Sequence, residues 1–149
     1  MKNFLKLKER IKTNEGFRNR AYKDSLGFYT IGYGHLIKKN QRYLLKKKFS
    51  KQHLSDLFDL DFSKAVKSYK KIYQGIGHST NTQDVLIEMI FQLGPKKLIK
   101  FKKMNKNIRK KEFFMAALEM KQSLWYKQTP KRVDGLITIL LQKDYGKKR

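Results

Sequence analysis

The chain has 149 residues, which suits one domain with a sizeable core, and it contains no apolar run of the roughly 18 to 20 residues needed to span a bilayer. Its 36 basic and 12 acidic residues leave a net charge of +24, which predicts attraction to polyanions such as an acidic cell envelope, lipid headgroups or nucleic acid. The absence of cysteine excludes disulfides and thiolate chemistry, and three scattered histidines predict no metal site.

The positive charge is carried mainly by lysine. Lysine supplies 29 of the 36 basic residues and arginine only seven, and the lysines are spread along the whole chain. Sites that read phosphates in detail usually favour the bidentate arginine fork. The distribution therefore predicts a general positive field and no specific nucleic-acid site. A lysine-rich habit of the source genome is an equally good explanation.

The first predicted element is a helix at residues 2–14, where apolar residues form a stripe and lysines occupy the other face. Gly16 is well placed to end this helix in a left-handed turn. Two short strands are expected next, on either side of a turn at 25–27. Residues 38–48 are ambiguous, and a third edge strand at 42–45 is one expectation for them.

A long helix is predicted at residues 50–74. Ser50 has the character of an N-cap, apolar residues recur at steps of three and four, and Gly75 stops the pattern. Further helices are expected after a polar loop at 75–82. Their ranges are Asp84–Leu93, Leu98–Met104, Ile108–Met120 and Val133–Leu141. The charged tail from Lys143 is expected to fray.

Two carboxylates stand near each other within the stretch 14–35. Glu15 lies at the predicted end of the first helix, where the helix dipole disfavours a negative charge and so favours a protonated side chain. Asp24 follows on the predicted hairpin, which can hold it across a small gap from Glu15. Glycoside hydrolysis requires such a pair, one carboxyl kept protonated and one ionised. Plainer explanations are a solvated glutamate at a helix end and an ordinary turn aspartate.

The order of residues in this stretch is similar to a known fingerprint. Glu15-Gly16, then Tyr22-x-Asp24, then the run Thr30-Ile-Gly-Tyr-Gly-His35 resembles the N-terminal signature of phage-type lysozymes, glycoside hydrolase family 24. Other family signatures follow in the same order along nearly the whole chain. They are Leu57-Phe58-x-x-Asp61, Phe91-Gln92-x-Gly94 and Trp125-Tyr126-x-Gln128-Thr129-Pro130-x-Arg132.

The resemblance implies an α+β, lysozyme-like fold in a single domain, residues 1–149. A small N-terminal β-hairpin lobe at about 13–49 would be joined by one long helix, at about 50–74, to a mostly helical C-terminal lobe. That lobe would consist of residues 75–143 together with the N-terminal helix at 2–14. The region between the hairpin and the long helix is shorter than in family members from T-even phages, which predicts a trimmed hairpin lobe.

The resemblance also implies roles for individual residues. Glu15 would be the general acid, Asp24 would act on the attacking water, and Thr30 would help to position that water. Arg132 would support Glu15, and His35 would pair with Asp61 between the hairpin and the long helix. The residues expected to contact substrate are Leu36, Phe91, Gln92, Trp125 and Gln128. For Trp125 a place in the core is an equally good explanation, and for Phe91 and Gln92 the alternative is packing at a helix end.

The expected activity is that of a peptidoglycan hydrolase, an endolysin that cleaves the β-1,4 bond between N-acetylmuramic acid and N-acetylglucosamine, with inversion. No cofactor and no metal are implied, and the expected state is a monomer whose partner is bacterial peptidoglycan. Anionic envelope or membrane lipids are further expected partners, through the +24 surface. Charges interrupt the N-terminus before any apolar run of signal-peptide length, so we expect synthesis in the cytoplasm and release to the wall with a holin-like partner.

One alternative belongs to a different class. A highly basic protein that binds membranes or polyanions, and kills bacteria without turnover, would account for the lysines. It would leave the combination of Glu15, Asp24 and Thr30 unexplained. Loss of activity on changing Glu15 to glutamine distinguishes the enzyme from this alternative.

Overall fold

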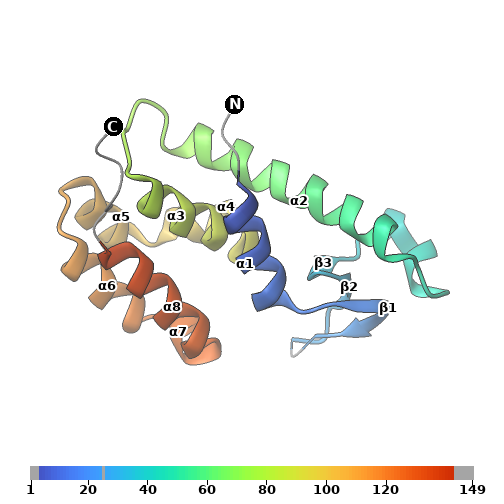
Figure 1. Cartoon of the computed structure of the whole chain (residues 1–149). Helices are drawn as coiled ribbons and strands as arrows, with labels where there is room; N and C mark the ends of the chain where they lie inside the picture. The colour runs from blue at the N-terminus through green and yellow to red at the C-terminus, as the bar shows by residue number, and fades with distance from the viewer. Residues whose placement is uncertain (1–3, 25, 143–149) are drawn as a thin grey trace. The chain divides into compact units, whose positions relative to one another are not determined.

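The computed structural model describes residues 4–24 and 26–142 (Figure 1). The chain divides into two compact units, Met1–Lys64 and Ala65–Arg149, and the boundary between them falls inside the longest helix, α2. The first unit carries a small antiparallel sheet, and the second is helical. This is the α+β, lysozyme-like architecture that the sequence predicts. None of the helices within the described residues is long and apolar enough to cross a membrane.

The elements of the first unit alternate between helix and strand. Helix α1 buries Leu7 and Ile11 and ends at Gly16, whose φ of 74° and N–H bond of 2.9 Å to Lys12 O confirm the predicted turn out of the helix. The long helix α2 begins after Ser50, whose Oγ accepts the His53 N–H at 3.1 Å. The elements are α1 (Leu5–Glu15), β1 (Arg18–Lys23), β2 (Tyr29–Gly32), β3 (His35–Leu36), η1 (Lys39–Leu45) and α2 (Lys51–Ile72).

The sheet has the strand order β1-β2-β3, with both pairs antiparallel and an irregular register between Arg18 and Tyr22. The third edge strand expected at 42–45 is wrong, because these residues belong to the 3-10 helix η1. Local hydrogen bonds replace a strand ladder there. The Gln41 N–H donates to Lys38 O at 2.9 Å, and the Lys38 N–H donates to the Gln41 side chain at 3.1 Å.

One face of the sheet rests on α2. Ile31 of β2 is completely buried and packs with Leu44, Leu54 and Leu57 in a small core, which Ile37 and Phe49 border. Complete burial of side chains of this size stabilises a fold by about 1.5–3 kcal/mol each. The core therefore fixes which face of the sheet points away from α2 and is available for chemistry.

A polar pair holds the same face of the sheet to α2. His35 Nδ1 lies 2.7 Å from Asp61 Oδ2, and His35 Nε2 lies 2.9 Å from Gln41 Oε1. Gln41 Oε1 also accepts the Lys38 N–H, so it is an acceptor and His35 must donate from Nε2. Both ring nitrogens therefore carry protons. Burial lowers the pKa of His35, but the hydrogen bonds to Asp61 and Gln41 outweigh it, and the pKa is raised above 6.5.

The second unit is built around α3, whose Val85, Leu86, Ile87 and Met89 are completely buried. Helix α3 packs against α4 and α8, and α6 packs against α5 and α8. The elements of this unit after α2 are α3 (Thr80–Leu93), α4 (Pro95–Lys100), α5 (Lys102–Arg109), α6 (Phe113–Lys121), α7 (Leu124–Gln128) and α8 (Pro130–Leu141).

Four helix predictions differ from the structure. The helix expected at Asp84–Leu93 begins four residues earlier, at Thr80 and inside the loop expected at 75–82, because Ser79 caps it by accepting the Thr82 N–H at 3.2 Å. The single helix expected at Leu98–Met104 is two, because Asn105 Nδ2 caps the carbonyls of Leu98 and Phe101 at 3.0 Å each and ends α4. The helix expected at Ile108–Met120 is likewise broken, at Lys111, whose φ is 60°. Helix α7, which Ser123 caps, was not predicted. The predicted helix at Val133–Leu141 is confirmed as α8, and the tail from Lys143 lies outside the described residues.

The charged state of His35 predicts a pH-dependent stability. Because the folded pKa is raised, the pair contributes fully below pH 6.5 and its contribution is lost as the pH rises through the folded value. We expect the wild type to lose more unfolding free energy than His35→Gln between pH 6 and pH 9, by roughly 1.5–3 kcal/mol, measured by urea denaturation. Burial lowers the pKa of His78, so the titration of His78 affects stability only below pH 6.5. This effect is the same in the wild type and in His35→Gln. Equal slopes for the two proteins would contradict a charged His35.

Candidate active site

Glu15 is the last residue of α1 and is half-buried. Its carboxyl group lies directly on the backbone of Gly34, since a Cβ at position 34 would stand 2.8 Å from Glu15 Cδ. Gly34 also has a φ of 74°, a conformation that residues with a side chain rarely adopt. The turn between β2 and β3 therefore approaches the end of α1 as closely as the backbone allows.

Tyr33 anchors this turn. Its ring lies 4.9 Å from the ring of Phe17 and 5.7 Å from that of Phe58, measured between centroids. Lys12 Nζ stands 5.1 Å from the Tyr33 centroid and 5.0 Å from the Phe58 centroid, within cation–π range. Because Lys12 is in the last turn of α1, these contacts join the helix end, the turn and α2. These contacts fix the turn against which the Glu15 carboxyl group lies.

Asp24 follows β1 and is held by the turn that it begins. Its Oδ1 accepts two backbone N–H groups, from Leu26 and Phe28, each at 2.9 Å. Its own N–H donates to Phe28 O at 2.8 Å. No hydrogen bond to the second carboxylate oxygen is found among the described residues. The turn therefore orients the carboxylate and leaves one oxygen available to a ligand or a water.

Thr30 lies in the middle of β2 and is buried. Its partner across β1 is Tyr22 and its partner across β3 is Leu36, so the three side chains lie in one row on the same face of the sheet. Ile31 and His35 point to the other face, toward α2. The Thr30 hydroxyl donates to Phe28 O at 3.2 Å, which leaves its lone pairs as acceptors.

Tyr22 connects the two carboxylates electrostatically, and the sequence did not assign it to the site. Burial raises the pKa of Tyr22, the negative charge of Glu15 raises it further, Arg18 lowers it, and Asp24 raises it again. Charge effects of this kind fall off with distance, so Tyr22 lies within reach of both acids. Its signal in the sequence is its spacing, because it lies near the end of β1 and two residues before Asp24. Tyr22 and Thr30 thus lie in one row of the sheet, Asp24 follows directly after β1, and the charge of Glu15, at the turn between β2 and β3, reaches Tyr22.

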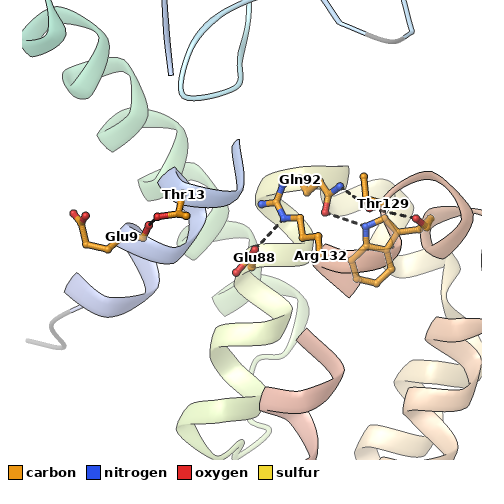
Figure 2. Close-up of polar contacts among 7 residues, drawn as sticks. Glu9, Thr13, Glu88, Gln92, Thr129 and Arg132 are labelled. Carbon is orange, nitrogen blue, oxygen red and sulfur yellow. Dashed lines mark hydrogen bonds and ion pairs between the residues drawn. The ribbon is translucent and has the colours of Figure 1, made fainter. Parts of the chain in front are cut away.

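In the second unit, residues predicted to contact substrate form a hydrogen-bonded network instead of standing free (Figure 2). Trp125 Nε1 donates to Gln92 Oε1 at 2.9 Å, and Gln92 Nε2 donates to Thr129 Oγ1 at 3.3 Å. Trp125 is buried, with its ring edge-to-face against Phe101 at 5.9 Å. Gln128 is exposed and Phe91 is half-buried. Their contacts with substrate, and that of the exposed Leu36, stay predictions.

Arg132 forms an ion pair that the sequence analysis missed. Its Nε donates to Glu88 Oε2 at 3.0 Å, and the Glu88 side chain is completely buried (Figure 2). The signal was available, because Glu88 is the one charged residue in the apolar run from Val85 to Leu93. A buried carboxylate requires such a partner. The prediction that Arg132 supports Glu15 stays a prediction. In that role Arg132 would act while its charge is paired with that of Glu88.

Comparison with known proteins identifies the family. A sequence model of the family described as phage lysozyme matches residues 12–139. Probable T4-type lysozyme 2 of Dictyostelium discoideum is 35% identical over an aligned length of 158 residues. The match covers 89% of this chain and 92% of that protein. Probable T4-type lysozyme 1 of the same organism is 33% identical over 159 residues, with 90% and 92% covered. The pre-baseplate central spike protein Gp5 of Enterobacteria phage T4 is 29% identical over 92% of this chain, but over only 28% of its own length.

A small antiparallel sheet, a mostly helical remainder and a match to lysozymes over about 90% of the chain define an α+β glycosidase. The chain belongs to the phage lysozyme family. Its enzyme class is therefore that of a lysozyme, which hydrolyses peptidoglycan. Among the described residues, no group of three or more acidic or histidine side chains is placed to hold a metal ion.

The contact between Gly34 and Glu15 predicts a sensitive position. Gly34→Ala places a methyl group against the Glu15 carboxyl, and we expect a loss of lytic activity of at least tenfold in a turbidity assay on bacterial walls. Gly75→Ala is the matched control, because Gly75 has a similar φ of 78° but nothing within 4 Å of the added methyl. Both variants should lose about 1–2 kcal/mol of stability from the left-handed backbone. Equal activities in the two variants would show that the Gly34 contact does not position Glu15.

The buried ion pair predicts a large effect on stability. Glu88→Gln removes the charge opposite Arg132, and we expect a loss of about 3–5 kcal/mol in unfolding free energy, measured by urea denaturation. Asp134→Asn breaks the exposed pair with Lys121, whose Nζ–Oδ1 distance is 3.8 Å, and should cost less than about 1 kcal/mol. A small effect of Glu88→Gln would show that this ion pair contributes little to the stability of the second unit.

Proposed function

We propose that this lysozyme cleaves the β-1,4 bond between N-acetylmuramic acid and N-acetylglucosamine by a single displacement with inversion at the anomeric carbon. The observation that carries the proposal is the grouping of Glu15, Asp24 and Thr30 around Tyr22 on the face of the sheet turned away from α2. Inversion requires a water between two carboxyl groups about 6.5–9.5 Å apart.

Glu15 is proposed as the general acid that protonates the glycosidic oxygen as the bond breaks. Its position at the C-terminal end of α1 supports this role, because the free carbonyl groups of a helix end disfavour a second negative charge. The contact with Gly34 limits the rotamers of the side chain and so limits where its proton can point. A fixed donor direction is a requirement for efficient proton transfer.

Asp24 and Thr30 are proposed to hold the attacking water between them. Asp24 keeps one carboxylate oxygen in the turn and offers the other as a base. The Thr30 hydroxyl donates a hydrogen bond to Phe28 O and can accept a hydrogen bond from a ligand. A water that donates one hydrogen to Asp24 and the other to Thr30 directs its lone pair at the anomeric carbon. The two residues together therefore select both the position and the orientation of the nucleophile.

The charge of +24 supports an anionic substrate surface. A strongly positive protein is concentrated at an acidic cell wall, and the effect weakens as salt screens it over about 8–10 Å at 0.1–0.15 M. From the family resemblance alone, we also propose that the protein acts as a monomer and reaches the wall after release from the cytoplasm with a holin-like partner.

The chemistry is tested by digestion of peptidoglycan in oxygen-18 water. We expect mass spectrometry to find labelled reducing ends on N-acetylmuramic acid, because the water that Asp24 and Thr30 hold becomes part of the product. Glu15→Gln should reduce the yield at least a hundredfold, since general acid catalysis contributes about 10²–10⁴. Glu9→Gln, on an exposed face of α1, is the control and should keep full activity.

Two other results would redirect the proposal. Anhydro-muramic ends without label would mean transglycosylation in place of hydrolysis. Killing of bacteria that survives Glu15→Gln and disappears at high salt would instead favour a cationic antibacterial action without turnover, for which the +24 charge is the supporting observation.

A further inference from the structure

Helix α6 has apolar residues on both of its faces. One face, with Ala116, Ala117 and Met120, is buried in the second unit, where α6 packs against α5 and α8. The opposite face is exposed: Phe114 is 81% exposed, Met115 47% and Leu118 46%. Helices that are apolar all round are normally buried all round. We refer to Phe114, Met115 and Leu118 as the exposed α6 face.

The exposed α6 face continues into a pocket of about 570 Å³ within the second unit. Phe113, Phe114, Ile108 and Leu140 line the pocket with apolar groups, and Arg109 and Lys111 line it with positive charges. Pockets of this volume accommodate small ligands or segments of an alkyl chain. The site therefore combines an apolar surface with cations at its edge.

The surrounding segment is strongly basic. Residues 96–121 contain ten lysines and arginines but only two acidic residues, Glu112 and Glu119, which leaves a net charge of +8. The basic residues are Lys96, Lys97, Lys100, Lys102, Lys103, Lys106, Arg109, Lys110, Lys111 and Lys121. A second copy of the chain would bring two such segments together, and their repulsion opposes self-association. A purely polar polyanion would satisfy the cations and leave the apolar side chains in water.

An anionic lipid surface satisfies both features. Lysines and arginines near such a surface are each attracted to it, and apolar side chains at the same edge enter the boundary between headgroups and acyl chains. We propose that the exposed α6 face, with Arg109 and Lys111 beside it, binds anionic phospholipid bilayers, the phosphates resting on the cations and Phe114 entering the acyl layer. The binding is to the surface only, consistent with the absence of a membrane-spanning helix among the described residues.

This binding site shares no residue with those proposed for catalysis. Phe114, Met115 and Leu118 belong to the second unit, whereas Glu15, Asp24 and Thr30 belong to the first. Substitutions on the exposed α6 face should therefore change lipid binding and leave the hydrolysis of soluble wall fragments unchanged. Membrane attachment would hold the enzyme at the surface that borders the wall.

The test is sedimentation of the full chain with vesicles of equal parts phosphatidylglycerol and phosphatidylethanolamine. We expect wild type to bind them and to bind vesicles of phosphatidylcholine at least tenfold more weakly. Phe114→Ser should weaken binding to the anionic vesicles about tenfold, which is the effect expected for one buried aromatic side chain. The control is Leu60→Ser, on α2, because Leu60 is 60% exposed but lies outside the site.

A second measurement gives the depth of insertion and does not rely on loss of binding. Phe114→Trp should show quenching of its fluorescence by brominated acyl chains, above the background of Trp125 in the wild type, which is buried. Arg109→Gln/Lys111→Gln should weaken binding and reduce its dependence on salt more than Lys48→Gln/Lys51→Gln, an exposed pair in the first unit. Equal binding by Phe114→Ser and wild type, or no quenching at position 114, would overturn the proposal and leave non-specific attraction by charge.

Discussion

The contact between Glu15 and Gly34 is the constraint on which the geometry of the first unit depends. It works because the turn between β2 and β3 has no side chain at the point where it meets the end of α1, so the carboxyl group rests on bare backbone. On the other side of the sheet, Ile31 and the pair of His35 with Asp61 hold the strands to α2. The sheet is therefore held by α1 at this turn and by α2 on one face, and its other face is left for chemistry.

Acidic groups are scarce in this chain, and three of those that the structure describes have specific structural partners. Asp24 accepts hydrogen bonds from the N–H groups of its own turn, Asp61 accepts a hydrogen bond from His35, and Glu88 forms an ion pair with Arg132 inside the second unit. In a protein with a net charge of +24, the positive charges around a carboxyl group favour its ionised form. A general acid in such a protein has to be protected from these charges by its local position. Among the described carboxyl groups, that of Glu15 lies at the C-terminal end of α1 and against the backbone of Gly34, and this position is the basis for proposing it as the general acid.

The two units divide the properties of the enzyme between them. The first carries the carboxylates and is rigid where the aromatic rings of Phe17, Tyr33 and Phe58 meet Lys12. The second is a helical body with a core along α3, internal networks at Trp125 and Arg132, and an unusual exposed α6 face. A contiguous patch of apolar side chains exposed to water is unfavourable, and proteins usually avoid one unless a partner covers it. Lysines around the same face indicate which charge that partner carries.

The sequence by itself determined the elements and the family, because these depend on neighbours along the chain. The three- and four-residue steps of α2, the glycine after Glu15 and the hairpin around Asp24 are local patterns, and family membership follows from motifs read in order. Tertiary structure decided the partner of Arg132, the burial of Trp125, the break at Phe101, where Asn105 caps α4, and the exposure of Phe114. Each of these depends on a side chain or packing surface that other parts of the chain supply. A pattern of residue types specifies that a group needs a partner, and only the packed chain specifies which one it meets.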